Sequence, residues 1–168
     1  MSLSRIVPFL RSIGIPVRCT DLAEPTFLPG VTLSRGALLY DPARLLHPGD
    51  LLHEAGHLAF ALPSVRATLS GAGAFDLGEE MAAIAWSWAA LVHLRLDPAV
   101  VFHGGGYRGA SHAFIENFSA RRFVGVPLLQ WAEMTTEKEF PAMRCWLRPQ
   151  PELLAGFYED VRPEALAE

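Results

Sequence analysis

Residues 50–62 have the sequence DLLHEAGHLAFAL, and we expect the rest of the chain to be organised around them. The stretch is predicted to be a helix, in which His53 and His57 lie one turn apart on the same face. Their Cβ atoms are then about 5–6 Å apart, so both imidazoles can reach one metal ion. Glu54 flanks that ion, where its carboxylate can accept a proton from a metal-bound water. The pattern is that of an H-E-x-x-H metal site.

The residues around the motif argue against a merely charged helix face. The flanking residues are mostly leucine, alanine and phenylalanine, so the helix is predicted to be largely buried, where unpaired polar groups are costly. Gly56 in mid-helix costs about 1 kcal/mol relative to alanine, which predicts a close approach by another backbone. Asp50 is predicted to be the N-cap of this helix.

Composition limits the class of protein. The 168 residues are predicted to form one domain, with a core at about 15–96 and a helical extension at 97–168, and half of them are apolar. A net charge of −4 leaves no basic surface, so nucleic acid is not an expected partner. No pattern in the sequence indicates an oligomeric state.

Membrane insertion and export are not expected either. The most apolar stretch, residues 81–94, is shorter than the roughly 20 residues of a membrane span. The apolar part of residues 1–11 is too brief for a signal peptide, which predicts a cytoplasmic protein. In that compartment Cys19 and Cys145 are expected to be reduced.

The predicted fold class is α+β, mostly helical, with a small N-terminal sheet packed on the motif helix. A strand at 15–18 and a hairpin with strands at 31–33 and 37–40 form that sheet. The further helices are expected at 2–13, 77–96, 111–123, 127–133 and 141–147. The helix at 77–96 is apolar nearly all round, which is typical of a helix at the centre of a domain.

A catalytic zinc ion usually has three protein ligands, so the two histidines need a partner. A third histidine six residues after His57 would extend the motif, but that position is Pro63. Glu79 and Glu80, at the start of the helix at 77–96, are the best source. The other acidic and histidine side chains, Asp76, His93, His103 and His112, are weaker candidates.

A capping argument separates the two glutamates. Asp76 and Glu79 have the spacing of a capping box, in which Glu79 folds back to the amide of the N-cap residue. Glu80 is then free, and the small residues Ala83 and Ser87 on its face allow two helices to approach closely. The sequence therefore favours Glu80 as the third ligand, with Glu79 as the alternative.

These features resemble the ImmA/IrrE-like group of short gluzincin-type zinc metallopeptidases. The matching residues are 52–58, with sequence LHEAGHL, and 80–83, with sequence EMAA, and the resemblance extends over about 15–96. It implies a zincin-like fold and a zinc-dependent hydrolase that cleaves a peptide or protein substrate. The implied roles are Zn²⁺ binding by His53, His57 and Glu80, and general-base catalysis by Glu54.

The sequence departs from that group at one position. The group has asparagine, and gluzincins more widely have aspartate, four residues after the ligand glutamate, where it supports a ligand histidine. That position here is Ile84, or Ala83 if Glu79 is the ligand. The supporting group would come from Ser87, Glu116 or Asn117, or the site is weakened. The departure favours a rival hypothesis, a non-enzymatic zinc-binding protein that acts as a regulatory or interaction module.

Two further hypotheses concern the surroundings of the metal. An edge strand of the hairpin at 31–40 could bind an extended substrate by adding it to the sheet. The glycine-rich loop at 103–109 and the helix after it offer Tyr107, Arg108 and His112 as donors to an oxyanion. A third class of function, an apolar ligand bound among Trp86, Trp88 and Phe102, is less favoured because such residues usually form the core.

Overall fold

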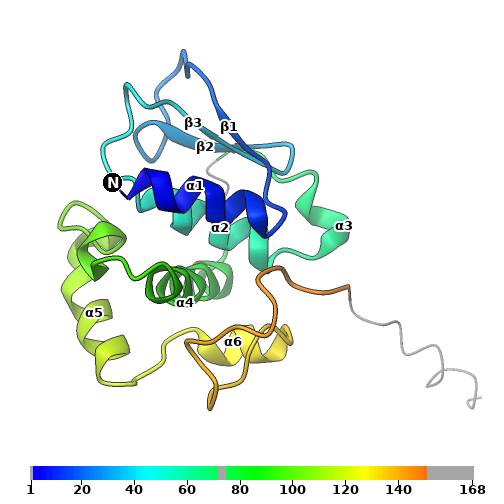
Figure 1. The fold of residues 1–168 in the computed structure, drawn as a ribbon, viewed down its shortest axis with the longest axis vertical. Coiled ribbons are helices and arrows are strands. Elements are labelled where there is room, and N and C mark those ends of the chain that lie inside the picture. The colour runs from blue at the N-terminus through cyan, green and yellow to red at the C-terminus, as the bar shows by residue number, and fades with distance from the viewer. Residues whose placement is uncertain (1, 72–74, 151–168) are drawn as a thin grey trace, which may run out of the picture.

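The computed structural model describes residues 2–71 and 75–150, which form an α+β fold with a small mixed sheet (Figure 1). Its elements are α1 (Leu3–Ser12), β1 (Val17–Cys19), β2 (Val31–Ser34), β3 (Ala37–Tyr40), α2 (Asp50–Phe60), α3 (Pro63–Arg66), α4 (Leu77–His93), the 3₁₀ turns η1 (Pro98–Val100) and η2 (Tyr107–Gly109), α5 (Ser111–Ser119) and α6 (Val126–Trp131). The coarse fold class predicted from the sequence is confirmed.

The three strands form a sheet in the order β1-β3-β2, with β1 parallel and β2 antiparallel to the central strand β3. Arg35 and Gly36 join β2 to β3 and have φ angles of +47° and +72°. Two consecutive positive φ angles are typical of the type I′ turn, which joins the strands of two-residue hairpins because its backbone twist matches the twist of those strands. The predicted hairpin is therefore confirmed, and β2 is an edge strand.

Helix α2 lies in the middle of the molecule, between the sheet and α1 on one side and α4 on the other (Figure 1). Its apolar residues Leu51, Leu52, Ala55, Leu58 and Ala59 are fully buried. Helix α4 is buried on all sides from Ala82 to Leu91, as its composition predicted. The H-E-x-x-H motif thus lies in α2, which packs against α4, and these are the two most buried of the described helices.

The two central helices touch at Gly56. A Cβ atom placed on Gly56 would lie 2.9 Å from the Cα atom and 2.9 Å from the carbonyl oxygen of Ala83. Real Cβ atoms do not approach backbone atoms so closely, so this crossing requires glycine. The close approach predicted from a glycine in mid-helix is confirmed, and it sets the spacing between the motif and α4.

The aromatic residues proposed to line a ligand site belong to the core instead. Trp86 is fully buried, and its indole nitrogen donates to the carbonyl oxygen of Trp146 at 2.9 Å. Trp88 and Phe102 are also buried. The Trp88 ring stacks on Phe118, and the Phe102 ring packs against Phe118 at a tilt. The described residues therefore give no support to an apolar ligand site among these three side chains.

Several predicted helix ends were misplaced. Helix α4 ends at His93 and α5 at Ser119, because Arg95 and Arg121 just beyond them adopt positive φ angles of 49° and 57°. A left-handed residue after the last turn is a usual way to end a helix. The strand predicted at 15–18 lies at Val17–Cys19.

One further helix prediction was wrong, and one helix was not predicted. Residues 141–147 form turns and bends, not a helix, whereas Pro63 begins the short helix α3. Among the described residues, Cys19 and Cys145 are free. No described helix has both the length and the apolar character needed to cross a membrane.

Candidate metal centre

Three side chains from two helices converge on one point. His53 and His57 project from the same face of α2, and their Nε2 atoms lie 3.3 Å apart. Glu80, in the first turn of α4, places Oε2 3.4 Å from His53 Nε2 and Oε1 3.6 Å from His57 Nε2. These three residues form a group that could hold a metal ion. The structure thus brings together the three ligands favoured from the sequence.

The spacing of the donor atoms fits a zinc ion. Zinc binds histidine nitrogen and carboxylate oxygen at about 2.0–2.2 Å with tetrahedral geometry, so neighbouring ligand atoms are separated by about 3.3–3.6 Å. The two Nε2 atoms are 3.3 Å apart, and each lies in that range from a different oxygen of the Glu80 carboxylate, Oε2 at 3.4 Å from His53 and Oε1 at 3.6 Å from His57. Two imidazoles and one carboxylate are also a donor set that zinc accepts.

The capping box predicted from the sequence is present and engages Glu79. The Asp76 carboxylate accepts from the amide of Glu79 at 2.8 Å, and the Glu79 carboxylate accepts from the amide of Asp76 at 2.9 Å. Glu79 is thereby held at the start of α4. Glu80, the next residue, is turned toward the histidines, and its hydrogen bond with His53 is the main cause of its lowered pKa.

Burial sets the charge state of two groups in the centre. It lowers the pKa of His57 from 6.5 to about 3, so this imidazole is neutral at pH 7 in the metal-free protein. A neutral imidazole has a free electron pair for a metal ion. Burial also raises the pKa of Glu54 from 4.5 to about 7, aided by the charges of Glu80 and Asp50. Such a value suits a group that accepts and returns a proton near neutral pH.

The ring nitrogens that face away from the cluster have no supporting group among the described residues. His53 Nδ1 and His57 Nδ1 are buried without a hydrogen-bond partner. The candidates named from the sequence are engaged elsewhere. The Ser87 hydroxyl donates to backbone carbonyls, Glu116 faces His112 at the surface, and the Asn117 side chain accepts from Arg122. Of the two alternatives left open by the sequence, support of a ligand histidine by one of these residues is not seen, and a weakened site is the alternative that remains.

The glycine-rich loop does fold over the centre, through Tyr107. The Tyr107 ring meets the His53 ring edge to face, with ring centres 5.5 Å apart. Burial raises the pKa of Tyr107, as do the nearby charges of Asp50, Glu80 and Glu54, so its hydroxyl stays protonated at neutral pH. Tyr107 and Arg108 both have positive φ angles, 54° and 52°. Strained backbone of this kind clusters at functional sites.

The other two donors proposed from this region differ in their positions. Arg108 is exposed, but its charge is close enough to Glu80 to contribute to the lowered pKa of that carboxylate. The His112 side chain is 84 % exposed and faces Glu116 on the same helix. Only Tyr107 of the three is packed against a residue of the metal cluster.

A buried pair that the sequence did not reveal anchors this loop. Asp50, predicted to cap α2, is instead its first residue after the N-cap Gly49 and does not cap the helix. Its Oδ1 lies 2.9 Å from His103 Nε2, and the His103 ring stacks on His47 with centres 3.5 Å apart. The Ser111 hydroxyl donates to the His103 carbonyl at 2.6 Å. In the sequence, the only signal for this anchoring role was the position of Asp50, one turn before Glu54.

The edge strand β2 is partly covered. The Leu33 carbonyl oxygen accepts a hydrogen bond from the Gly71 amide at 2.7 Å, and the Ser70 hydroxyl accepts from the amide of Arg35 at 2.8 Å. The chain after α3 therefore already pairs with part of the edge that was proposed to bind substrate.

Searches against protein-family models, curated proteins and solved structures find no match to this chain.

Proposed function

We propose that this protein is a zinc-dependent metallopeptidase with a zincin-like fold, similar to the ImmA/IrrE-like group. The observation that carries the proposal is the convergence of His53, His57 and Glu80, whose possible ligand atoms lie within 4.8 Å of one another, with the carboxyl group of Glu54 buried beside them. A zinc ion bound there would act as a Lewis acid and lower the pKa of a coordinated water to about 7.

Glu54 acts as the general base and acid. Its Oε2 atom is buried and has no hydrogen-bond partner among the described residues, and burial raises the pKa of this group to about 7 in the metal-free protein. It takes one proton from the attacking water and delivers it to the nitrogen of the leaving amine, which balances the hydrolysis of one peptide bond.

Tyr107 is the residue best placed to stabilise the oxyanion that forms from the substrate carbonyl. It packs against His53, and its raised pKa keeps the hydroxyl proton available for donation. The pair of Asp50 and His103 acts as a positioning pair, since it fixes the loop that carries Tyr107. A fixed donor aimed at developing charge contributes more to catalysis than one that must reorganise.

A specific observation favours a second candidate function, a zinc-binding regulatory or interaction module without activity. Neither His53 nor His57 has an acceptor for Nδ1 among the described residues, and such acceptors raise the basicity of ligand histidines. In that case the protein holds zinc for its structure and does not turn over substrate.

The experiment compares zinc content and hydrolysis. The wild-type protein should bind about one zinc ion per chain and cleave a mixture-based library of unfolded peptides. Glu54→Gln should keep the zinc and lose hydrolysis by at least about 100-fold. Glu116→Gln, at an exposed position of α5, is the matched control and should behave as wild type. Zinc binding without any cleavage would support the module, and failure to take up zinc would sink both functions.

A further inference from the structure

The two histidines of the candidate metal centre have no hydrogen bond that fixes the orientation of their rings. Their Nε2 atoms face Glu80, so a metal would be bound through these atoms. The opposite atoms, His53 Nδ1 and His57 Nδ1, are buried without a partner among the described residues. A ligand histidine usually donates its second ring N–H to an acceptor, which sets the plane of the ring. Another kind of contact must therefore orient these two imidazoles.

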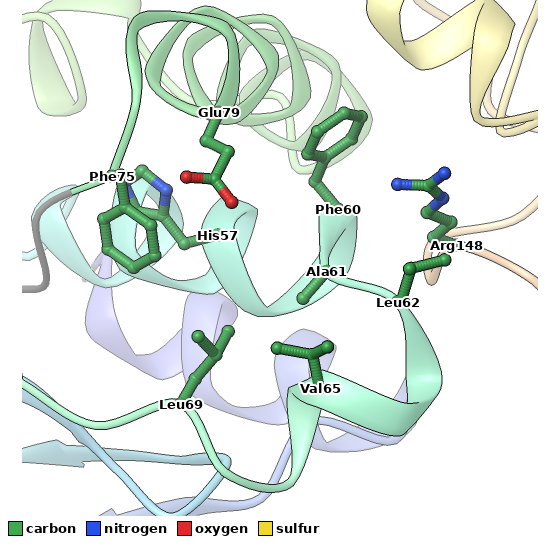
Figure 2. Close-up of a pocket in the computed structure, with 9 residues that line it drawn as sticks. All are labelled: His57, Phe60, Ala61, Leu62, Val65, Leu69, Phe75, Glu79 and Arg148. Carbon is green, nitrogen blue, oxygen red and sulfur yellow. The ribbon is translucent and has the colours of Figure 1, made fainter.

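Phe75 makes such a contact with His57. Its ring lies parallel to the imidazole, with ring centres 3.7 Å apart and planes 5° from parallel. Figure 2 shows the two rings against each other, beside Glu79 at the start of α4. At this separation the rings are in van der Waals contact across their faces. The imidazole cannot turn about its Cβ–Cγ bond without striking the Phe75 ring, so the stack fixes the plane of His57.

Tyr107 makes the corresponding contact with His53. The two rings meet edge to face, with centres 5.5 Å apart and planes at 89°. The two imidazoles are also nearly perpendicular to each other, with centres 4.9 Å apart. Edge-to-face contact is a favoured arrangement of aromatic rings. Phe75, His57, His53 and Tyr107 therefore form a continuous row of rings, with the two imidazoles in the middle.

The rings at the two ends of this row are anchored by their own segments. Phe75 directly precedes Asp76, the N-cap residue of α4, whose capping box fixes the backbone there. The Tyr107 ring packs against Phe102 and Phe114, with ring centres 5.1 and 5.6 Å apart. An end ring that is held in this way can restrain the imidazole beside it. The orientation of the imidazoles is thus set before a metal binds.

The surroundings of His57 offer no substitute for the Phe75 ring. Both residues border a cavity of about 150 Å³, and Arg148 lines the same cavity at its other end (Figure 2). If the Phe75 ring were removed, this space would extend over the face of the imidazole. His57 would then have room to turn its Nε2 atom away from Glu80.

We propose that Phe75 and Tyr107 are positioning residues, whose rings hold His57 and His53 in the orientation that binds the metal, in place of hydrogen-bond acceptors at Nδ1. The inference rests on the zinc centre of the proposed function and not on hydrolysis. The role of the Tyr107 ring is separate from that of its hydroxyl as an oxyanion donor. Ordering one mobile side chain on binding weakens affinity by about threefold to tenfold, which is the loss that each ring prevents.

Zinc affinity, measured by competition with a chromophoric chelator, tests this role at each ring. Phe75→Leu and Tyr107→Leu keep an apolar side chain without the ring, and each should lower the affinity by about threefold to tenfold. Phe75→Tyr and Tyr107→Phe keep the ring and should stay within about twofold of wild type. Phe123→Leu is the matched control, because Phe123 is half-buried like Phe75 and packs edge to face on Phe140, away from the metal cluster.

The spectrum of the cobalt-loaded protein distinguishes positioning from a merely structural role. Cobalt(II) can replace zinc, and its visible absorption depends on the arrangement of its ligands. Phe75→Leu and Tyr107→Leu should change this absorption, whereas the variants that keep the ring and Phe123→Leu should match wild type. A residue that only stabilises the fold would lower the urea midpoint of the metal-free protein and leave the spectrum unchanged.

The outcomes separate this proposal from the proposed function. If the wild-type protein takes up zinc and the folded leucine variants bind it within about twofold of wild type, or have unchanged cobalt spectra, the positioning role is overturned while the zinc centre stands. If circular dichroism shows that Tyr107→Leu does not fold, Phe75→Leu alone decides. If the wild-type protein takes up no zinc, the proposed function fails, and the positioning role is overturned with it.

Discussion

Replacing Gly56 by alanine should weaken both the fold and the metal centre, because this glycine sets the distance between α2 and α4. The added Cβ atom would lie 2.9 Å from the Cα atom and from the carbonyl oxygen of Ala83, and 3.1 Å from its Cβ atom. Two of these three atoms belong to the backbone, so no side-chain rotation relieves the contact. The helices must move apart by several tenths of an ångström.

Two opposing free energies determine the change in stability. Alanine has a higher helix propensity than glycine by about 1 kcal/mol. Inserting a methyl group into a tightly packed contact costs about 1–3 kcal/mol, and a contact with backbone atoms belongs at the upper end of that range. The free energy of unfolding should therefore fall by about 1–2 kcal/mol, which urea denaturation of the zinc-free protein would measure.

The same displacement acts on the candidate metal ligands. His53 and His57 lie on α2 and Glu80 on α4, so moving the helices apart lengthens the separations of 3.4 and 3.6 Å between them. Zinc affinity should fall on the order of tenfold, measured by competition with a chromophoric chelator. A Gly56→Ala variant that is more stable by about 1 kcal/mol and binds zinc as wild type would refute this reasoning.

Three more predictions concern single side chains. Glu80→Gln should lower zinc affinity strongly, whereas Glu79→Gln should leave it within about threefold of wild type, because Glu79 is engaged in the capping box; chelator competition on both variants checks this. Tyr107→Phe should lower kcat by about 100-fold with little change in zinc content, and steady-state kinetics on a cleaved peptide would contradict this if only KM changed. In zinc-free protein, the raised pKa of Glu54, from 4.5 to about 7, contributes stability that is present below pH 4.5 and lost as the pH rises to 7. The lowered pKa of His57, from 6.5 to about 3, contributes stability that is present above pH 6.5 and lost as the pH falls to 3. Urea denaturation in the presence of a chelator should therefore show that the Glu54→Gln variant gains stability relative to wild type as the pH rises from 4.5 to 7, at up to about 1.4 kcal/mol per pH unit. Both proteins should lose stability as the pH falls below 4.5. Parallel pH profiles of the two proteins would rule this out.

The parts of the centre that could be predicted are those set by position along one helix. His53 and His57 share a face because a helix repeats every 3.6 residues, whatever packs around it. The capping box at Asp76 and Glu79 is likewise local, so the choice of Glu80 over Glu79 followed from residues within one turn. The close crossing at Gly56 could also be inferred, since an unfavourable glycine inside a buried helix requires a reason.

The errors came from residues whose partners are distant in sequence. Asp50 has the residue type and position of an N-cap, but the tertiary contact with His103 takes its carboxylate away from the helix end. Ser87 was one of three candidates for supporting a histidine, but it lies within reach of the Ala83 and Leu52 carbonyls and donates there. Local propensity describes the alternatives open to a side chain, and packing selects among them.

The sequence by itself determined the α+β class, the paired histidines of the motif and the glutamate best able to join them, because each depends on helical spacing or on a local cap. The tertiary structure decided that possible ligand atoms of these three residues lie within 4.8 Å of one another, that the Tyr107 ring packs against His53, and that Arg148 helps to enclose a cavity beside His57. These contacts join elements separated by long loops, whose paths depend on how the whole core packs and not on any one segment.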